Sequence, residues 1–249
     1  MDVLSGKFTF IGLENYQRMI ESGYFFQTIL NTLLIWIMSI IPQLTIAFVL
    51  SLILSNKWFR GKFLLRNLYY FPNLVTPVTI GLLFGALFSY PGGAVNNIIS
   101  TFGLEAVDFQ NNPMLARIVI AIAICWKNFG FNIIYFTAGI NSISEEVMEA
   151  AEVDGAGWLQ KLLYITIPQV RKAAGMILFL AVINSFKVFR EAYIVAGSYP
   201  NDRIYLLQHL FNHWFLNLDV QKMCAAAVLL TIVIGIFLIP FVIRAGGDE

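Results

Sequence analysis

Ionisable and amide side chains interrupt apolar stretches of the sequence at two places. Lys127 lies within a long, mostly apolar run, with Asn128 and Asn132 close behind it. A second group follows downstream and consists of Asn184, Lys187, Arg190 and Glu191. Charges within an apolar medium are costly, and they usually face a bundle interior or a water-filled path. These two groups could therefore form hydrogen bonds with a polar solute that passes through the protein.

The same side chains also have a purely structural interpretation. Lys187 and Glu191 are four residues apart, so they can pair on one helix face, while Arg190 can extend to a membrane interface. For these three residues the sequence favours internal pairing. For Lys127 a solute contact and a contact between helices remain equally open.

Other chemistries lack the residues that they need. His209 and His213 are four residues apart, but the sequence offers no third metal ligand, and Cys125 and Cys224 stand alone in apolar stretches. No G-x-x-x-x-G-K-[ST] motif predicts a nucleotide phosphate site. No nucleophile elbow or Ser/His/Asp set indicates an enzyme. We therefore expect this chain to bind no metal and no cofactor.

The elements that position these residues are predicted to be transmembrane helices. The chain has 249 residues, of which 58% are hydrophobic and 12% charged, and its net charge of +1 gives no reason to expect a nucleic-acid partner. Crossing a bilayer core of roughly 30 Å takes about 20 apolar residues in a helix. The sequence therefore predicts an all-α, polytopic membrane bundle that forms a single domain, 1–249. About five spans are expected, at 28–54, 68–88, 115–138, 173–194 and 223–243.

The distribution of basic residues predicts how the bundle is oriented. Between the first two spans the chain is crowded with Lys57, Arg60, Lys62 and Arg66. The next connection, 89–114, has two acidic residues and no Lys or Arg, so the first loop is expected in the cytoplasm and the second outside. Alternation then places 139–172 and the C-terminus inside and 196–221 outside. It also places 1–27 outside, from which we expect a sixth, N-terminal span upstream.

The cytoplasmic segment 139–172 is predicted to fold as a helix, a break and a second short helix. Ser144 is placed to cap the first helix, and two glutamates follow it at the positive end of the helix dipole. Gly155 supplies the left-handed residue of the break. Pro168 is expected to help end the second helix. That helix presents an apolar stripe made of Trp158, Leu159, Leu162 and Leu163.

The segment contains Glu149-Ala150-Ala151, then Gly155 four residues later, and then Ile165-Thr166-Ile167-Pro168. In these residues it resembles the EAA loop of the permease subunits of binding-protein-dependent ABC importers. The family pattern ends in Ile-x-Leu-Pro, and this chain departs from it only at Ile167, a volume-conserving exchange. Weaker similarities to the maltose-type and glycerol-phosphate-type sugar permeases lie at 12–16, 31–32 and 71–72. The resemblance implies that 141–169 is a coupling loop. Its coupling residues would be Glu149, Ala150, Ala151, Asp154, Gly155, Ile165 and Pro168.

The resemblance also implies partners and a location. An ABC ATPase dimer would bind ATP and Mg²⁺, a second permease subunit would complete the path, and an extracytoplasmic binding protein would deliver a sugar or sugar-like solute. The chain would lie in the cell membrane, with the EAA loop in the cytoplasm. An ion-driven secondary transporter should show internal repeats, which the sequence lacks. A degenerate subunit that no longer transports remains an open alternative.

Overall fold

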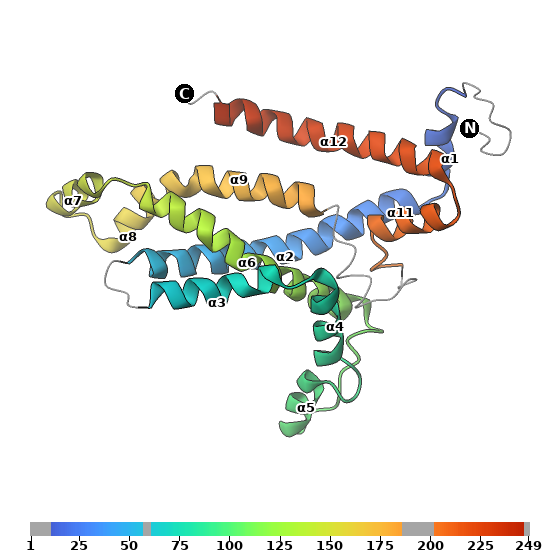
Figure 1. The fold of residues 1–249 in the computed structure, drawn as a ribbon, viewed down its shortest axis with the longest axis horizontal. Helices are drawn as coiled ribbons and strands as arrows, with labels where there is room; N and C mark the ends of the chain where they lie inside the picture. The colour runs from blue at the N-terminus through green and yellow to red at the C-terminus, as the bar shows by residue number, and fades with distance from the viewer. Residues whose placement is uncertain (1–10, 57–60, 186–201, 247–249) are drawn as a thin grey trace.

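The computed structural model describes residues 11–56, 61–185 and 202–246, and these residues form helices without strands (Figure 1). The predicted all-α membrane bundle is confirmed. In chain order the helices are α1 (Glu14–Glu21), α2 (Tyr24–Ser55), α3 (Lys62–Leu74), α4 (Pro77–Leu87), α5 (Ala94–Thr101), α6 (Pro113–Asn141), α7 (Glu145–Val153), α8 (Trp158–Lys161), the π-helical turn η1 (Leu162–Thr166), α9 (Ile167–Ser185), α11 (Leu207–Leu216) and α12 (Val220–Gly246).

Helices α2 and α6 form the centre of the bundle. With 32 and 29 residues, both are long and apolar enough to cross a bilayer, which confirms the spans predicted at 28–54 and 115–138. Asn112 begins α6, because its Oδ1 accepts hydrogen bonds from the backbone N–H groups of Met114 (3.0 Å) and Leu115 (3.3 Å). Helix α6 packs against α2, α3, α4 and α9, so most of the bundle is assembled around it.

The second predicted span, 68–88, is wrong as a single helix. Helices α3 and α4 meet at 95°, and α4 turns away from the bundle together with α5 (Figure 1). The cause is Pro77, which has no N–H to continue α3 and restricts Thr76 to an extended conformation (ψ 145°). Thr76 then starts α4, since its Oγ1 accepts a hydrogen bond from the N–H of Thr79 at 3.2 Å.

The fourth predicted span begins earlier than expected, because Pro168 does not end the preceding helix. Helix α8 runs through the π-helical turn η1 into α9, and Pro168 is the second residue of α9. Proline clashes with the carbonyl four residues before it in a regular α-helix, and the wider π turn relieves that crowding. The predicted span, 173–194, is described as helix as far as Ser185, and the rest of it lies outside the described residues.

Helix α12 contains the fifth predicted span, 223–243. Together with α1 and α11 it encloses a core of its own, built on Met19, Phe25, Leu210 and Trp214. Two further clusters lie where α2 and α6 meet α4 and α9. Part of the segment 196–221, which the sequence predicts to lie outside the membrane, forms α11.

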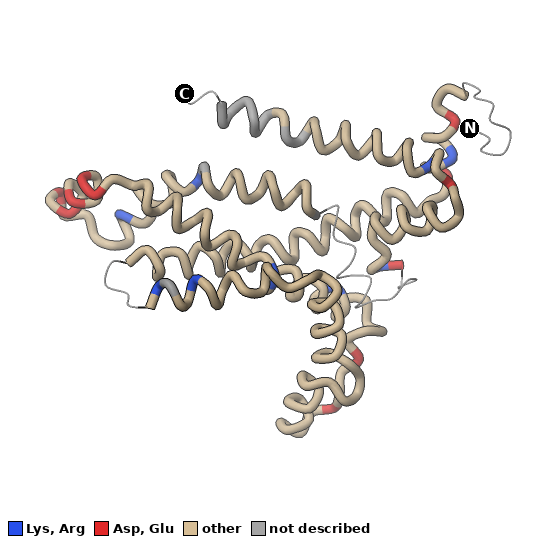
Figure 2. Tube along the Cα trace, viewed as in Figure 1, with Lys and Arg blue, Asp and Glu red and all other residues tan. Residues whose placement is uncertain are grey.

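Charged residues mark the two ends of the bundle. The acidic residues of α7 lie at one end, near the basic start of α3, while α1 and α11 lie at the other end (Figure 2). The end of α2 and the start of α3, which flank one connection that the charge pattern assigns to the cytoplasmic side, are thus at the same end of the molecule as the α7–α8 segment. The helix order is that of a chain crossing back and forth.

Gly130 fixes how closely α3 and α6 approach each other. A Cβ atom at this position would lie 1.8 Å from the backbone oxygen of Tyr69, so no side chain fits without movement of the backbone. We expect Gly130→Ala to destabilise the protein by about 1–3 kcal/mol, as overpacked cores do. The measurement is the melting temperature of the detergent-solubilised protein. Gly85→Ala in α4 is the control, because a Cβ there meets nothing within 4 Å; equal melting temperatures in the two variants would contradict the prediction.

Candidate functional site

The α7–α8 segment forms a rigid elbow, as the sequence predicts. Gly155 has a left-handed φ of +79° and ends α7. The N–H of Ala156 donates to the carbonyl of Ala151 at 2.8 Å, and the N–H of Gly155 donates to the carbonyl of Glu152 at 3.0 Å. This pair of bonds is the Schellman motif, which satisfies the last carbonyls of a helix and fixes the direction of the following chain.

One side-chain contact joins α8 to α7, and a second caps the start of α8. Lys161 Nζ lies 2.6 Å from Glu152 Oε1, and Gln160 Oε1 accepts a hydrogen bond from the N–H of Gly157 at 2.8 Å. The hydrogen bond from Lys161 and its positive charge lower the pKa of the Glu152 carboxyl below its ordinary value. The break between the two helices is therefore a set angle and not a loose linker.

The solvent-exposed surface of the elbow is apolar. Val153, Trp158 and Tyr164 are 88%, 70% and 76% exposed, and a Cβ at Gly155 would meet nothing within 4 Å. Of the predicted coupling residues, Ala151 and Ile165 are half-buried, and the exposed ones are Glu149, Ala150, Asp154, Gly155 and Pro168. An exposed apolar surface with acidic neighbours is typical of a surface that docks a protein.

The predicted cap of α7 is wrong in one detail. Ser144 occupies the N-cap position with the expected extended backbone (ψ 143°), but its side chain forms no capping hydrogen bond. The two glutamates expected in the first turn, Glu145 and Glu146, are there. The extended backbone of Ser144 and the two glutamates at the positive end of the helix dipole therefore define the start of α7 without a hydrogen bond from the Ser144 hydroxyl.

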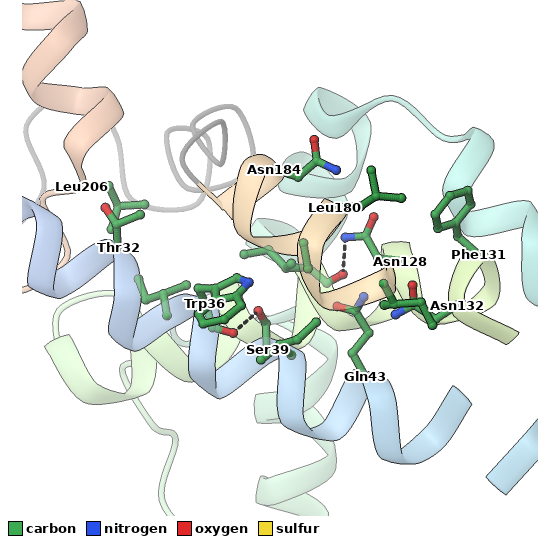
Figure 3. A pocket seen from close by; sticks show the side chains of 15 residues that line it. Thr32, Trp36, Ser39, Gln43, Asn128, Phe131, Asn132, Leu180, Asn184 and Leu206 are labelled. Atoms are coloured by element: carbon green, nitrogen blue, oxygen red, sulfur yellow. Dashed lines mark hydrogen bonds between the residues drawn. The ribbon is translucent and has the colours of Figure 1, made fainter. Parts of the chain in front are cut away.

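A cavity of about 80 Å³ lies between α2, α6 and α9 (Figure 3). Its lining carries amide, hydroxyl and indole groups but no charged side chain. The polar groups come from Thr32, Trp36, Ser39, Gln43, Asn128, Asn132 and Asn184. A space of this size holds several water molecules and is too small for a whole sugar ring with its neighbours.

Two hydrogen-bond donors in this cavity are buried without a partner. They are Trp36 Nε1 and Asn132 Nδ2. By contrast, Asn128 Nδ2 donates to the carbonyl of Ile124 at 2.9 Å, and Ser39 Oγ donates to the carbonyl of Trp36 at 2.8 Å. An unsatisfied buried donor costs about 1–3 kcal/mol, so each of these two groups is available to a molecule that enters the cavity.

The structure brings together part of the group predicted to contact a solute. Asn128, Asn132 and Asn184 meet at the cavity. Lys127 is half-buried and is not among the lining residues, because one step along a helix turns a side chain about 100° away from Asn128. Its solute contact stays a prediction. Lys187, Arg190 and Glu191 lie outside the described residues.

The sequence interpretation missed the contribution of α2. Thr32, Trp36, Ser39 and Gln43 line the cavity from this helix. Their spacing of four, three and four residues is that of one helix face, and it stands out within an otherwise apolar span. A search for polar residues at helical spacing would have found them without any charged residue as a marker.

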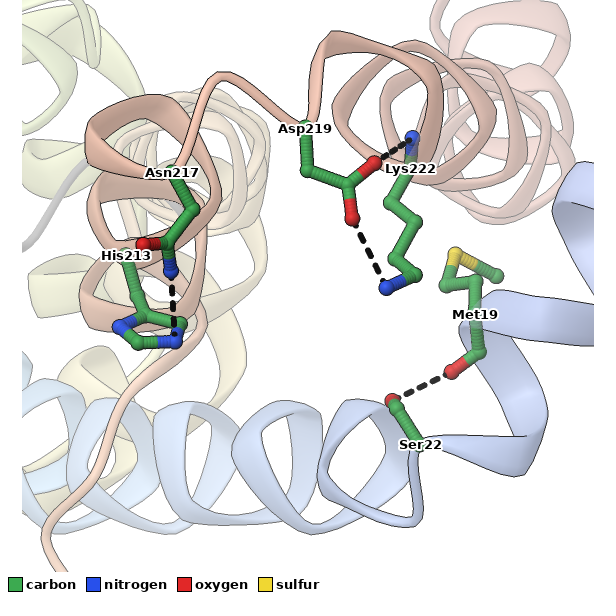
Figure 4. Close-up of polar contacts among 6 residues, drawn as sticks. All are labelled: Met19, Ser22, His213, Asn217, Asp219 and Lys222. Atoms are coloured by element: carbon green, nitrogen blue, oxygen red, sulfur yellow. Dashed lines mark hydrogen bonds and ion pairs between the residues drawn. The ribbon is translucent and has the colours of Figure 1, made fainter.

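The two histidines of α11 serve different partners. His209 is buried, and its Nδ1 accepts a hydrogen bond from the N–H of Leu206 at 3.2 Å. His213 Nε2 lies 3.0 Å from the amide nitrogen of Asn217, near the ion pair between Asp219 and Lys222 (Figure 4). Among the described residues no three His, Cys, Asp or Glu side chains gather as metal ligands do.

A helical bundle of this kind, with a polar cavity between its long helices and a rigid elbow at one end, defines a multi-pass membrane permease. The chain matches the family described as the binding-protein-dependent transport system inner membrane component over residues 25–245, and it belongs to that family. Permeases of ABC importers are thus its relatives, as the EAA-type segment predicts.

Curated relatives and solved structures agree with this assignment. The arabinooligosaccharides transport system permease protein AraP of Halalkalibacterium halodurans is 29% identical over 93% of this chain and 74% of its own length. The lactose transport system permease protein LacF of Rhizobium radiobacter is 27% identical, over 83% of this chain and 70% of its own. A crystal structure of a bacterial ABC transporter that imports alginate has the same fold, with a TM-score of 0.83 and 23% identity over 96% of this chain and 85% of that one.

The Glu152–Lys161 pair predicts how the elbow responds to pH. Because the pKa of Glu152 is lowered in the folded protein, the pair stabilises the elbow fully above the ordinary pKa of 4.5 and is lost as the pH falls through the lowered value. Spin labels at Glu146→Cys and Tyr164→Cys should report a narrow distance distribution at pH 7. Lys161→Met should broaden it at pH 7, and Lys222→Met, which breaks the ion pair at the other end, should not. Equal distributions in both variants would show that the pair does not set the angle.

Proposed function

We propose that this chain forms part of the membrane path of an ATP-driven importer for a sugar or sugar-like solute. The observation that carries the proposal is the uncharged polar lining of the cavity, with the unpartnered donors of Trp36 and Asn132. Carbohydrates present many hydroxyl groups, each a donor and an acceptor, and amide side chains match both. The names of the relatives, which transport arabinooligosaccharides and lactose, support the same class of solute.

The small volume of the cavity fits a path that is completed elsewhere. A space of about 80 Å³ cannot enclose an oligosaccharide, so this chain supplies one wall in a closed arrangement. A second permease subunit would supply the opposite wall. Transport would then follow from movement of two such bundles relative to each other, which opens the space to one side at a time.

The elbow is the proposed contact with a separate ATPase dimer, which would bind ATP and Mg²⁺. The coupling segment 141–169 has an open apolar surface around Trp158 and a fixed angle at Gly155, both of which a docking element needs. The exposed positions Glu149, Ala150 and Asp154 would lie against the ATPase. The sequence has no phosphate-binding loop of its own, which agrees with ATP hydrolysis on a partner.

The proposed orientation places the elbow and the C-terminus in the cytoplasm of a cell-membrane protein. The basic start of α3 and the elbow lie at the same end, which supports this orientation through the positive-inside rule (Figure 2). An extracytoplasmic binding protein would then approach the end that carries α1 and α11. One of the similar solved structures is an alginate ABC transporter in complex with a periplasmic protein bound to an alginate pentasaccharide.

Removing the amide of Asn132 tests the cavity. Asn132→Leu should lower solute uptake by about tenfold or more, since one or two hydrogen bonds to the solute are lost. It should not lower the melting temperature, because Asn132 Nδ2 has no partner to lose. The measurement is binding-protein-dependent uptake of labelled arabinooligosaccharide into proteoliposomes that contain the whole transporter.

Thr45→Val is the matched control for this variant. Thr45 lies on the exposed side of α2, and its hydroxyl donates to the carbonyl of Ile41 in its own helix at 2.9 Å. Its uptake should equal that of the unsubstituted protein. Undiminished uptake in Asn132→Leu would remove the cavity from the path.

Two substitutions at Gly155 separate the angle of the elbow from the absence of a side chain. Asparagine tolerates a left-handed backbone and valine does not, while open space surrounds either side chain. We expect Gly155→Asn to keep most of the ATPase stimulation by the loaded binding protein and Gly155→Val to lose it. Both variants should insert in the membrane in equal amounts. If Gly155→Val were fully stimulated, the fixed angle would have no role in coupling.

A further inference from the structure

An irregular segment of backbone, 202–207, closes one end of the cavity. Thr32 and Leu206 line that end, and both lie at the same side of the pocket in Figure 3. The segment consists of turns and extended residues as far as Leu206 and ends on Leu207, the first residue of α11, so 202–206 lies outside the helices. Within a membrane bundle such a backbone persists only where other groups satisfy it.

Side chains of α2 provide the first set of these hydrogen bonds. Asn31 Nδ2 donates to the carbonyl of Asp202 at 2.7 Å and to that of Tyr205 at 3.1 Å. One helical step further, Thr32 Oγ1 accepts a hydrogen bond from the N–H of Leu207 at 3.1 Å. Asn31 and Thr32 are 4% exposed, so water does not compete for these bonds.

Arg117 of α6 provides the second set. Its Nε and Nη2 both donate to the carbonyl of Arg203, at 2.8 and 2.5 Å, and Nη2 also donates to Asn31 Oδ1 at 2.7 Å. The guanidinium thus joins α6, α2 and the segment through uncharged oxygens. A planar fork with several fixed donors can make these bonds at once, which a lysine cannot.

We propose that Asn31, Thr32 and Arg117 form an outer latch that holds 202–207 over the cavity, so that Arg117 is a positioning residue for access from the outer side. This inference rests on the proposed function of the cavity as part of the path. The latch consists of hydrogen bonds between side chains and the backbone of 202–207, together with the bond from Arg117 to Asn31, and no helix has to unfold for it to release. When α2 and α6 move apart, Arg117 and Asn31 separate and the segment loses both supports.

Chemical labelling of a buried cavity position tests the latch. Ser39 lines the cavity and is 1% exposed, so a cysteine there reacts only when the cavity opens. The background carries Cys125→Ala and Cys224→Ala, and the reagent is a negatively charged methanethiosulfonate that cannot cross membranes. It is added to the outer face of vesicles that contain the whole transporter. We expect Arg117→Gln to raise the labelling rate of Ser39→Cys by about tenfold, as the loss of one to two hydrogen bonds predicts.

Asn31→Asp is a second variant that changes the latch in a different way. The carboxylate still accepts from Arg117, but it places an acceptor against the carbonyls of Asp202 and Tyr205 in place of the donor. It should raise labelling as Arg117→Gln does. Arg18→Gln is the matched control at the same end of the molecule, since Arg18 pairs with Glu14 within α1. Its labelling rate should not change.

The outcomes separate the latch from the proposed function. Labelling of both latch variants at the rate of Arg18→Gln would overturn the proposed latch. Failure of both variants to accumulate in the membrane would also overturn it, because these residues would then act in folding alone. The measurement needs no solute. Failure of the unsubstituted transporter to take up sugar would therefore contradict the proposed solute while leaving the labelling result valid.

Discussion

The contact between α2 and α6 is the interaction on which the rest of the molecule depends. Both helices cross the membrane, where no water satisfies a polar group, so every polar side chain between them needs a partner within the protein. The helices meet this condition near the start of each, where Asn31 bonds to Arg117. At the cavity the condition is not met, because the donors Trp36 Nε1 and Asn132 Nδ2 have no hydrogen-bond partner. The same interface thus holds the bundle together and leaves one place unsatisfied.

Sequence reasoning predicted the features whose causes are local. Apolar runs predict the long helices α2 and α6 because length and hydropathy alone determine a span. Gly155 predicts the elbow because only a left-handed residue ends α7 in that way. Pro77 could also have predicted the break at Thr76. The prediction joined α3 to α4 because the residues on both sides of the break are apolar. At Pro168 the sequence predicts a helix end that the structure does not have, because the π turn before it lets the helix continue through the proline.

The cavity could be predicted only in part, because it depends on which faces of distant helices meet. Asn128 and Asn132 were singled out through their neighbour Lys127, although the lysine lies on another face of α6. The prediction relied on charged residues as markers of polar sites, and it therefore missed the uncharged polar residues of α2 that line the cavity. The hydrogen bonds of Arg117 reach a segment 86 residues away, and no local pattern encodes that contact.

The two arms of the elbow lead into two of the helices that line the cavity. Helix α7 follows α6 after a turn of three residues, 142–144, and α8 continues through η1 into α9 without a loop. Asn132 lies on α6 and Asn184 on α9, so the arms continue into the helices that carry these two amides, and a displacement of the elbow would be passed to both. A flexible linker at either junction would absorb the displacement. Since the Schellman turn and the Glu152–Lys161 pair connect the arms, the proposed coupling would move α6 and α9 together.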